Sequence, residues 1–387
     1  MNNLIDLLKR EFRLFASNSV VLAIFIGAPL LYGLLLGAVY SKGKVDNLKV
    51  LVVDMDDSPM SARAIDMLSD NEVLFVDVRH DKTALNQAVI DDDYEAVITF
   101  PHRFEADIIQ KRHPEVQVEV NTANILPANY AAKAIQVALG TLNAGIEIQS
   151  LIKTGMPLAT AMESYEAFGV NYARFFNKSA NYMTFLWPGI LGVIIQQVFM
   201  LALALSFARE QEENTFHSEF YPRVRNPWYA MLIKSLPFWL MGLGIVAALW
   251  GMFPMFRMPM DFNGGAMLLL VALLIVSVTF MGIAVSLVIP SQLKATEILM
   301  VIATPSFILS GFTWPLSQMP GAIVMLAKTI PLTHFLEGMR KVLFYGASIA
   351  DIAPQLKGMI LISLFFALVS YTMFKVLPRL KTPNHTV

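Results

Sequence analysis

Long apolar stretches constrain the fold of this chain more than any other feature. A helix needs about 20 apolar residues to cross the hydrocarbon of a bilayer, where every backbone amide must be paired within the helix. Five stretches meet that requirement: 19–39, 185–208, 231–256, 266–289 and 358–377. A sixth stretch, 297–313, is shorter and marginal. The sequence therefore predicts a polytopic α-helical membrane protein with six transmembrane helices.

The overall composition agrees with a membrane protein and excludes several other classes. Of the 387 residues, 56% are hydrophobic and only 15% are charged, which is too apolar for an ordinary soluble protein. The net charge of −1, without a basic stripe, gives no reason to expect nucleic acid as a partner. The absence of cysteine excludes disulfides, thiolate metal ligands and thiol nucleophiles.

The segment before the first apolar stretch, 1–18, predicts an amphipathic helix that lies in the cytoplasmic membrane interface. It places Leu7, Leu8 and Phe15 beside charged residues such as Lys9 and Arg10. The stretch that follows is longer than the apolar part of a signal peptide, and no A-x-A site comes after it. We therefore interpret 19–39 as an uncleaved transmembrane anchor.

Basic residues near the ends of the stretches indicate the orientation, because positive charges gather on the cytoplasmic side. If the N-terminus is cytoplasmic, that side holds Lys9, Arg10, Arg13, Arg209, Arg223, Arg225, Lys294, Lys375, Arg379 and Lys381. The opposite side holds Arg257, Lys328, Arg340, Lys341 and Lys357. The excess favours cytoplasmic N- and C-termini, with 378–387 as a cytoplasmic tail.

Between the first two stretches, residues 44–183 have the composition of a water-exposed domain. The segments "LKVLVVDMD", "VLFVDV", "YEAVITF" and "VQVEVN" have the pattern of strands, and helix-like segments, including 82–92, lie between them. Ser58 followed by Pro59 is a typical helix start. The alternation predicts an extracytoplasmic α/β domain, and a long helical segment then returns toward the membrane.

The same domain gives no sign of a catalytic or metal site. Its histidines, His80, His102 and His113, lie in different predicted elements and without the spacing of metal ligands. The acidic run 91–93 is interpreted as a solvated helix end. No G-x-S-x-G motif, glycine-rich phosphate loop or carboxylate pair is present. We expect no metal, no cofactor bound to this chain, and no enzyme active site.

The charged segment 209–228 separates two apolar stretches and is the first candidate site. The chain lacks a P-loop motif, so ATP hydrolysis by that route would need a separate protein. That protein would need a cytoplasmic surface of this chain to bind. Acidic side chains would pair with that partner and aromatic side chains would anchor it. The candidate contacts are Arg209, Glu210, Glu212, Glu213, Thr215, Phe216, Phe220 and Tyr221. A solvated turn is the alternative, and the residues alone do not decide between the two.

The segment "ILSGFTWPLSQMPGAIVMLAKTIPLTHFLEGMR" contains prolines that leave its apolar pieces too short to span. Such pieces at membrane depth are typical of re-entrant helices, here predicted at 314–335 on the outer side. The candidate gate residues are Gly311, Phe312, Trp314, Pro315, Pro320, Pro331, Glu337 and Arg340.

These motifs resemble a known family. "SGFTWPLSQMP" followed by "IPLTHFLEGMR" is similar to the closing signature of ABC-2 type permeases, bacterial exporter subunits with a large extracytoplasmic insertion. "REQEENT" stands where that family has an E-x-E-x-G-T-like cytoplasmic loop. Asn214 replaces the usual glycine, and we expect the turn to survive because asparagine tolerates left-handed geometry.

The resemblance implies partners and a location in the bacterial inner membrane. It implies a second permease subunit, identical or paralogous, and two cytoplasmic ATPase subunits that carry the ATP and Mg²⁺. It also implies that 209–221 and the N-terminal helix form the ATPase contact, and that 314–335 closes the exit. A periplasmic adaptor is a further partner that the outer domain would meet in a two-membrane envelope.

The mildly polar residues of two stretches suggest a path for an amphipathic or hydrophobic substrate. The candidates along the subunit faces are Gln196, Gln197, Thr304, Ser306 and Ser310. Lys234 and Glu297 lie near cytoplasmic ends, where they can snorkel or cap, so no proton relay is expected in mid-span. A sensor or scaffold, whose outer domain binds a ligand or envelope partner, is the rival function, and a membrane-embedded enzyme is disfavoured.

Overall fold

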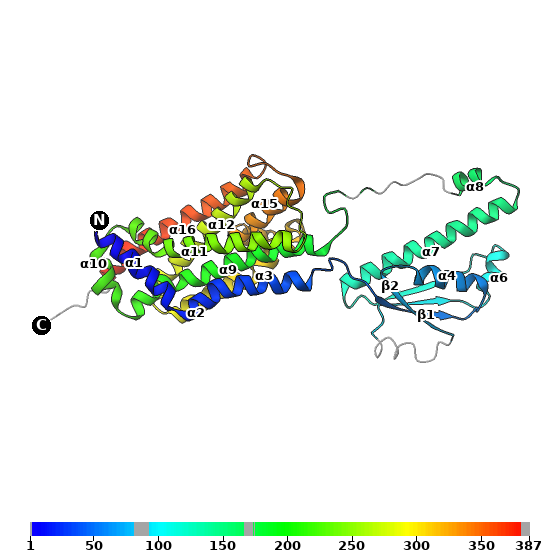
Figure 1. The fold of residues 1–387 in the computed structure, drawn as a ribbon, viewed down its shortest axis with the longest axis horizontal. Helices are drawn as coiled ribbons and strands as arrows, with labels where there is room; N and C mark the ends of the chain where they lie inside the picture. Colours follow the sequence, from blue (N-terminus) through cyan, green and yellow to red (C-terminus); the bar gives the residue numbers. More distant parts are fainter. Residues whose placement is uncertain (1, 81–92, 166–172, 174, 381–387) are drawn as a thin grey trace. The chain divides into compact units, whose positions relative to one another are not determined.

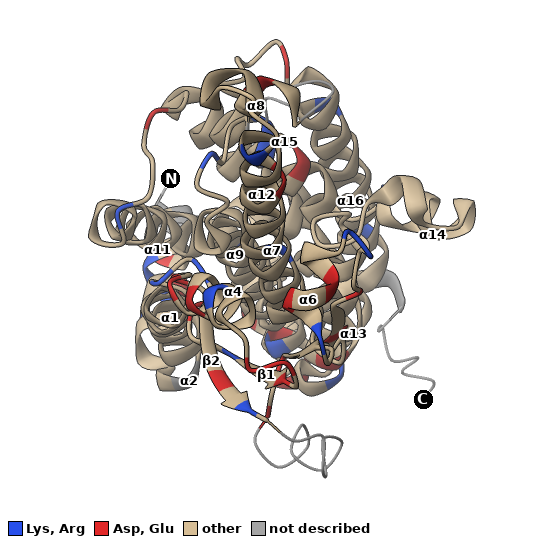
Figure 2. Cartoon of the chain, turned by 90° about the vertical axis from the view of Figure 1, so that its right-hand side faces the viewer, with Lys and Arg blue, Asp and Glu red and all other residues tan. Residues whose placement is uncertain are grey.

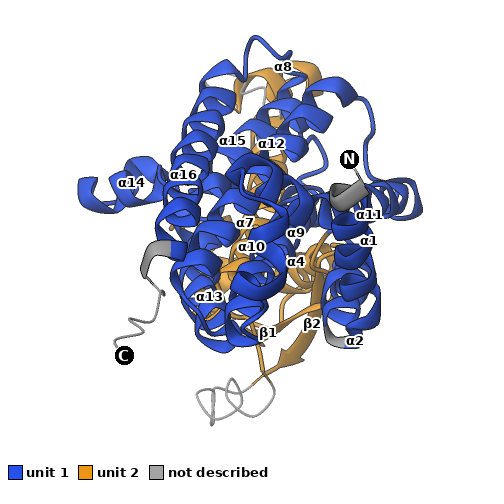
Figure 3. Ribbon diagram, turned by 90° about the vertical axis from the view of Figure 1, so that its left-hand side faces the viewer, with its two compact units in different colours: residues 1–43, 174–387 blue, residues 44–173 orange. Residues whose placement is uncertain are grey.

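The computed structural model describes residues 2–80, 93–165, 173 and 175–380, and it contains two compact units. Unit 1 comprises Met1–Gly43 and Arg174–Val387 and is helical; unit 2 comprises Lys44–Ala173 and contains a β-sheet (Figures 1 and 3). Each unit has its own cluster of buried apolar side chains. The predicted helix at 82–92 and most of the predicted tail at 378–387 lie outside the described residues.

Five helices among the described residues are long and apolar enough to cross a membrane. They are α9 (Tyr182–Glu212), α11 (Pro227–Met255), α12 (Gly264–Val288), α13 (Gln292–Leu309) and α16 (Ala353–Leu380). The marginal stretch at 297–313 is therefore part of a helix of sufficient length. α12 packs against both α9 and α16, and the long helices run side by side along the unit (Figure 1).

The first apolar stretch is not the uninterrupted α-helix that the sequence predicts. After α1 (Asn2–Ser17), the chain forms α2 (Ser19–Leu22), the π-helix η1 (Ala23–Gly27) and α3 (Ala28–Val39). Pro29 has no N–H to donate to the carbonyl of Phe25 one turn earlier, and this missing bond accounts for the wider turn at this place. The α3 segment packs against α9 and α11.

Glycines allow α9, α11 and α12 to approach closely. A Cβ atom at Gly242 of α11 would lie 2.2 Å from the ring of Phe199 on α9. A Cβ at Gly282 of α12 would lie 2.9 Å from the Cβ of Leu203 on α9. Small residues at such crossings are the usual means of packing helices in a membrane.

A Gly242→Ala variant is therefore expected to be less stable by about 1–3 kcal/mol, because its methyl group forces the Phe199 ring to move in a packed core. The measurement is unfolding of the detergent-solubilised protein. Gly244→Ala is a matched control on the same helix, since nothing lies within 4 Å of its Cβ. Equal stability of the two variants would contradict the packing described here.

Unit 2 contains strands at the four predicted places. The strands β1 (Leu48–Asp54), β2 (Leu74–Arg79), β3 (Ala96–Phe100) and β4 (Gln117–Val120) form a sheet in the order β2-β1-β3-β4. β1 is parallel to β2 and β3, and β4 is antiparallel to β3. The described helices of this unit are α4 (Pro59–Ser69), α6 (Phe104–Ile109), α7 (Ile125–Lys153) and α8 (Leu158–Ser164).

The helices α4 and α7 bury their apolar side chains against one face of this sheet. The side chain of Ser58 caps α4 by accepting a hydrogen bond from the N–H of Ser61, as the Ser-Pro signal predicts. The long helical segment predicted after the last strand is α7.

The connection between α13 and α16 contains only short elements, as its prolines predict. These are η3 (Leu316–Gln318), α14 (Gly321–Ala327) and α15 (Pro331–Tyr345). α14 projects from the side of unit 1 and carries no charged residue (Figures 2 and 3). Met325 on α14 is 71% exposed, so this helix presents an apolar surface with no cover from the described part of the chain.

Candidate functional site

The charged segment 209–228 lies at the end of unit 1 that also carries the N-terminus of the chain (Figure 1). It contains the last turn of α9, the π-helix η2 (Phe216–Phe220), α10 (Tyr221–Arg223) and the start of α11. Its side chains contact several helices of the unit, so the segment is more than a connecting turn.

A buried ionic cluster joins three helices at this end. The carboxylate of Glu210 on α9 accepts hydrogen bonds from Arg10 of α1 at 2.6 and 3.2 Å and from Lys234 Nζ of α11 at 2.6 Å. Glu11 of α1 also binds Lys234 at 2.9 Å and Arg10 at 3.0 Å. Two buried acids thus share two bases, so that the buried charges balance, and the exposed Glu219 lies 3.6 Å from Arg10 at the edge of the cluster.

Lys234 is the most buried base of the cluster, with 2% of its surface exposed. Its Nζ lies 4.7 Å from the ring centre of Phe220 and 5.7 Å from that of Phe207, so aromatic faces complete its surroundings. The sequence interpretation of Lys234 as a snorkelling residue is therefore wrong, because its ammonium group ends in this cluster and not in water. The sequence feature that could have indicated this buried ionic role is a single lysine in an otherwise apolar stretch.

The residues after Glu210 bind the ends of two other helices. Gln211 Nε2 donates to the carbonyls of Ser286 and Leu287 at the end of α12, at 3.0 and 3.2 Å. Glu212 accepts from the backbone N–H and the Nε2 of Gln292 at the start of α13, at 3.2 and 2.8 Å. Consecutive residues of the motif therefore bind α1 and α11, then α12, then α13.

The turn after this motif has the left-handed backbone geometry expected at Asn214, the position where the family usually has glycine. Asn214 has φ 57°, in the left-handed region, which confirms that asparagine maintains the turn. The hydroxyl of Thr215 donates to the Glu210 carboxylate, so the turn is tied to the ionic cluster. Glu213 pairs with Arg209 one turn earlier at 2.8 Å and remains exposed.

Three of the predicted partner contacts are buried and need correction. Phe216 and Phe220 have no exposed surface, and both pack with Phe207. Glu210 is 2% exposed, and its carboxylate binds Arg10 and Lys234 of the same chain. The two phenylalanines are therefore core residues of this end and not exposed anchors, because their rings already fill the space between α9 and η2. Tyr221 is partly buried, and Thr215 is half-covered.

An exposed surface remains around the cluster, and we call it the loop face. It combines acidic, basic and aromatic side chains: Glu212, Glu213, His217, Glu219, Arg223, Arg225, Trp228 and Tyr229. Only Glu212 and Glu213 of these residues were among the predicted contacts; the other six are His217, Glu219, Arg223, Arg225, Trp228 and Tyr229. In the sequence, they share only their position within the charged segment or, for Tyr229, directly after it.

The predicted path residues separate into two groups. Gln196 and Ser306 are buried and joined by a hydrogen bond of 2.8 Å between α9 and α13, and Ser310 is also buried. Gln197 is half-buried and Thr304 is exposed. Gln196 and Ser306 thus hold two helices together within the chain, which leaves Thr304 as the exposed polar member of this set.

The predicted gate residues largely meet at the other end of unit 1. Gly311, Phe312, Pro315, Glu337 and Arg340 line one pocket of about 200 Å³. The remaining gate candidates do not line that pocket: Trp314 is exposed, Pro320 precedes α14 and Pro331 begins α15.

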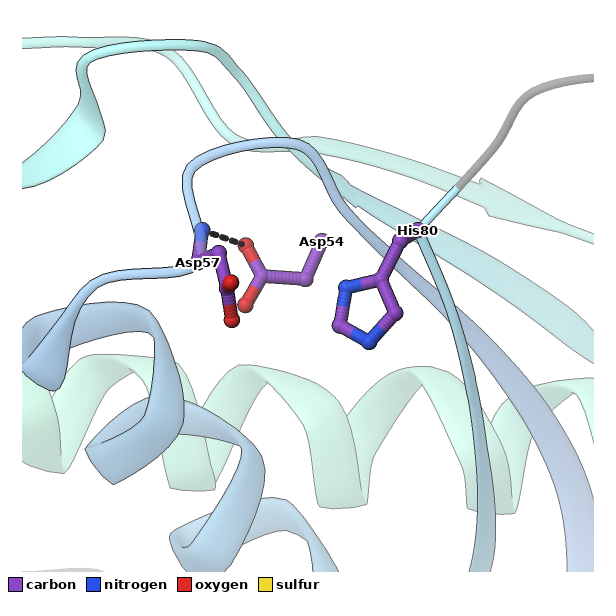
Figure 4. A group of neighbouring side chains, drawn as sticks. All are labelled: Asp54, Asp57 and His80. Carbon is purple, nitrogen blue, oxygen red and sulfur yellow. Dashed lines mark hydrogen bonds between the residues drawn. The ribbon is translucent and has the colours of Figure 1, made fainter.

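Within the described residues of unit 2, Asp54, Asp57 and His80 place possible metal-ligand atoms within 4.8 Å of one another (Figure 4). Asp54 ends β1, and His80 directly follows the neighbouring parallel strand β2, so the two residues lie side by side at one edge of the sheet. The spacing of histidines along the chain cannot reveal this proximity. Asp54 accepts hydrogen bonds from the N–H groups of Asp56 and Asp57 and from Ser61. These hydrogen bonds account for the burial of the Asp54 carboxylate. The three side chains alone do not indicate a metal site.

Comparison with known proteins agrees with the helical architecture. Residues 19–372 match the family described as ABC-2 family transporter protein. The chain is 22% identical over 370 residues to the inner membrane transport permease YhhJ of Escherichia coli, covering 92% of each protein. It is also 22% identical to the linearmycin resistance permease protein LnrN of Bacillus subtilis, covering 85% of this chain and 88% of that protein.

A eukaryotic relative is longer. ABC transporter G family member 20 of Dictyostelium discoideum is 23% identical over 358 residues, which are 88% of this chain and only 46% of that protein. The chain thus spans about half of that relative and nearly all of YhhJ. Permeases of this kind work with ATPase subunits and are membrane components of transporters, not catalytic enzymes. This multi-pass membrane protein belongs to the ABC-2 family of transporter proteins.

Proposed function

We propose that this chain is the permease subunit of an ATP-driven exporter, and that a separate cytoplasmic ATPase docks on the loop face. The observation that carries the proposal is the set of contacts made by Glu210, Gln211 and Glu212. These residues bind the helices α1, α11, α12 and α13 directly beside an exposed surface. A partner that moves this segment therefore acts on four helices at once.

The proposed topology has six crossings, with α2, η1 and α3 together forming the first. The loop face and both termini are cytoplasmic, and unit 2 is extracytoplasmic, in a bacterial inner membrane. The distribution of basic residues supports this orientation. Unit 2 then has the water-exposed position that its sheet and charged surface require.

The proposed cycle takes its energy from ATP and Mg²⁺ bound to the partner. Closure of two ATPase subunits would displace the loop face, and the packed helices would shift between two arrangements. A second permease subunit, identical or paralogous, would complete the path along the exposed face of α13, where Thr304 lies. The apolar surface of this helix suits an amphipathic or hydrophobic substrate, and a periplasmic adaptor would meet unit 2.

The orientation is tested by single cysteines, for which this cysteine-free chain is its own background. A membrane-impermeant maleimide applied to intact spheroplasts is expected to label Asp70→Cys, an exposed position of unit 2. It is expected to label Glu213→Cys only after permeabilisation. Labelling of Glu213→Cys from outside would overturn the orientation and, with it, the docking proposal.

The docking surface is tested by charge reversal. Glu213→Lys is expected to reduce co-purification of the ATPase about tenfold or more, because a like charge then faces the basic surface of the partner. The stability of the chain should change little, since Glu213 is exposed and its pair with Arg209 lies at the surface. Asp70→Lys in unit 2 is the matched control. If no nucleotide-hydrolysing protein co-purifies with the wild type, a sensor or scaffold becomes the better interpretation.

A further inference from the structure

Arg340 of α15 has an unusual environment at the end of unit 1 that carries the short helices. Its Nη2 donates a hydrogen bond of 2.7 Å to the carbonyl of Phe312. The guanidinium carbon lies 4.7 Å from the ring centre of Phe312 and 5.7 Å from that of Phe185. These two rings stack on each other at 5.1 Å. The base is therefore held against aromatic faces in a fixed position.

This guanidinium has no acidic partner within 4.0 Å among the residues that the structure describes. The acid one turn earlier, Glu337, is 3.5 Å from Lys341 and accepts a hydrogen bond from Gln355 at 2.8 Å. Arg340 Nε is buried and has no acceptor in the described part of the chain. A cation that is partly removed from water and lacks a counterion is costly unless an anion completes the site.

Space for such an anion exists beside it. The pocket of about 200 Å³ is lined by Arg340 and Glu337 together with Ser310, Phe312 and Leu316. Gly311, with φ 80°, allows the wall of the pocket to turn tightly against Leu316. Most of the other walls are apolar, and the neighbouring Trp314 is 58% exposed. A charged head and an apolar tail would both find matching surfaces here.

We propose that this pocket binds the oxyanion, a phosphate or carboxylate, of an anionic amphiphile. The planar guanidinium suits such groups because its N–H donors match two oxygens at once. Glu337 on the same pocket repels the anion and so weakens the site. If the proposed function is correct, the pocket lies at the outer exit, where weak binding permits release of an exported substrate.

The test measures binding to the full chain in phosphatidylcholine nanodiscs, without ATP or a partner. Radiolabelled dodecyl phosphate is expected to bind saturably above the level of empty nanodiscs. Arg340→Gln should weaken this binding about tenfold or more, because a charge-assisted bidentate contact is lost. Arg340→Lys keeps the charge but loses the bidentate fork, so its binding should fall between those of the wild type and Arg340→Gln. Arg257→Gln, at an exposed arginine between α11 and α12, is the control that should leave it unchanged.

A second variant gives a change of opposite sign. Glu337→Gln removes the repelling charge but keeps an oxygen for Gln355, so it should strengthen binding severalfold. A merely structural role of the pocket would make both Arg340→Gln and Glu337→Gln weaker binders, and that result would overturn the proposal. Unchanged binding by Arg340→Gln, in a variant that remains folded, would overturn it as well.

The source of the oxyanion is distinguished by competition. If inorganic phosphate displaces dodecyl phosphate only weakly, the ligand is an amphiphile; if it competes equally, the site takes the free ion. Because the measurement needs no transport, a chain that binds dodecyl phosphate but exports nothing would contradict the proposed function and leave the binding site intact.

Discussion

Replacing Lys234 by methionine is expected to lower the free energy of unfolding by about 3–5 kcal/mol, the usual cost of removing one partner from a buried ion pair. The lost ammonium group neutralises half of the buried acidic charge, and Glu11 and Glu210 would then share Arg10 alone. The measurement is unfolding of the detergent-solubilised protein by titration with dodecyl sulfate.

Two further variants separate electrostatics from packing. Lys294→Met, at an exposed lysine near the start of α13, should change the stability by no more than about 0.5 kcal/mol. In the double variant Lys234→Met with Glu11→Gln, the charges of the cluster balance again, and part of the lost stability should return. If Lys234→Met unfolds like the wild type, the cluster contributes no net stability to this end of unit 1.

The positions of the membrane helices were accessible from the sequence because the bilayer itself fixes their length. An apolar stretch of the required length must become a helix, whatever it packs against. The prediction was less accurate for two stretches. The stretch at 19–39 contains Pro29, which removes a backbone donor and interrupts the α-helix. The helix predicted at 297–313 begins earlier, at Gln292, because its first turn is polar.

The candidate site was predicted as a segment but not as a set of contacts. Aromatic residues four apart, such as Phe216 and Phe220, have the same pattern whether they face a partner or a core. The partners of Glu210 come from α1 and α11, and only tertiary structure brings them together. Charge along the chain therefore pointed to this segment, whereas only the structure shows which of its side chains are buried and which are exposed.

The transport function should depend on Glu212 more than on any other exposed acid of the loop face. Its carboxylate accepts two hydrogen bonds from Gln292, so it links the end of α9 to the first turn of α13. Glu212→Ala breaks this link and should reduce ATP-driven transport into inverted vesicles about tenfold, within the usual range of coupling energies. Co-purification of the ATPase should persist, because the remainder of the loop face is intact.

Asp261→Ala is the control for this prediction, since it removes an exposed acid of unit 1 that lies outside the loop face. Gln292→Ala removes the side-chain half of the link and should reproduce part of the loss. Because Glu212 and Gln292 act through one contact, the loss in the double variant should be smaller than the sum of the two single losses. If the two losses simply add, α13 is not driven through this contact, and the displacement of the loop must reach the helices through the ionic cluster on α1 and α11.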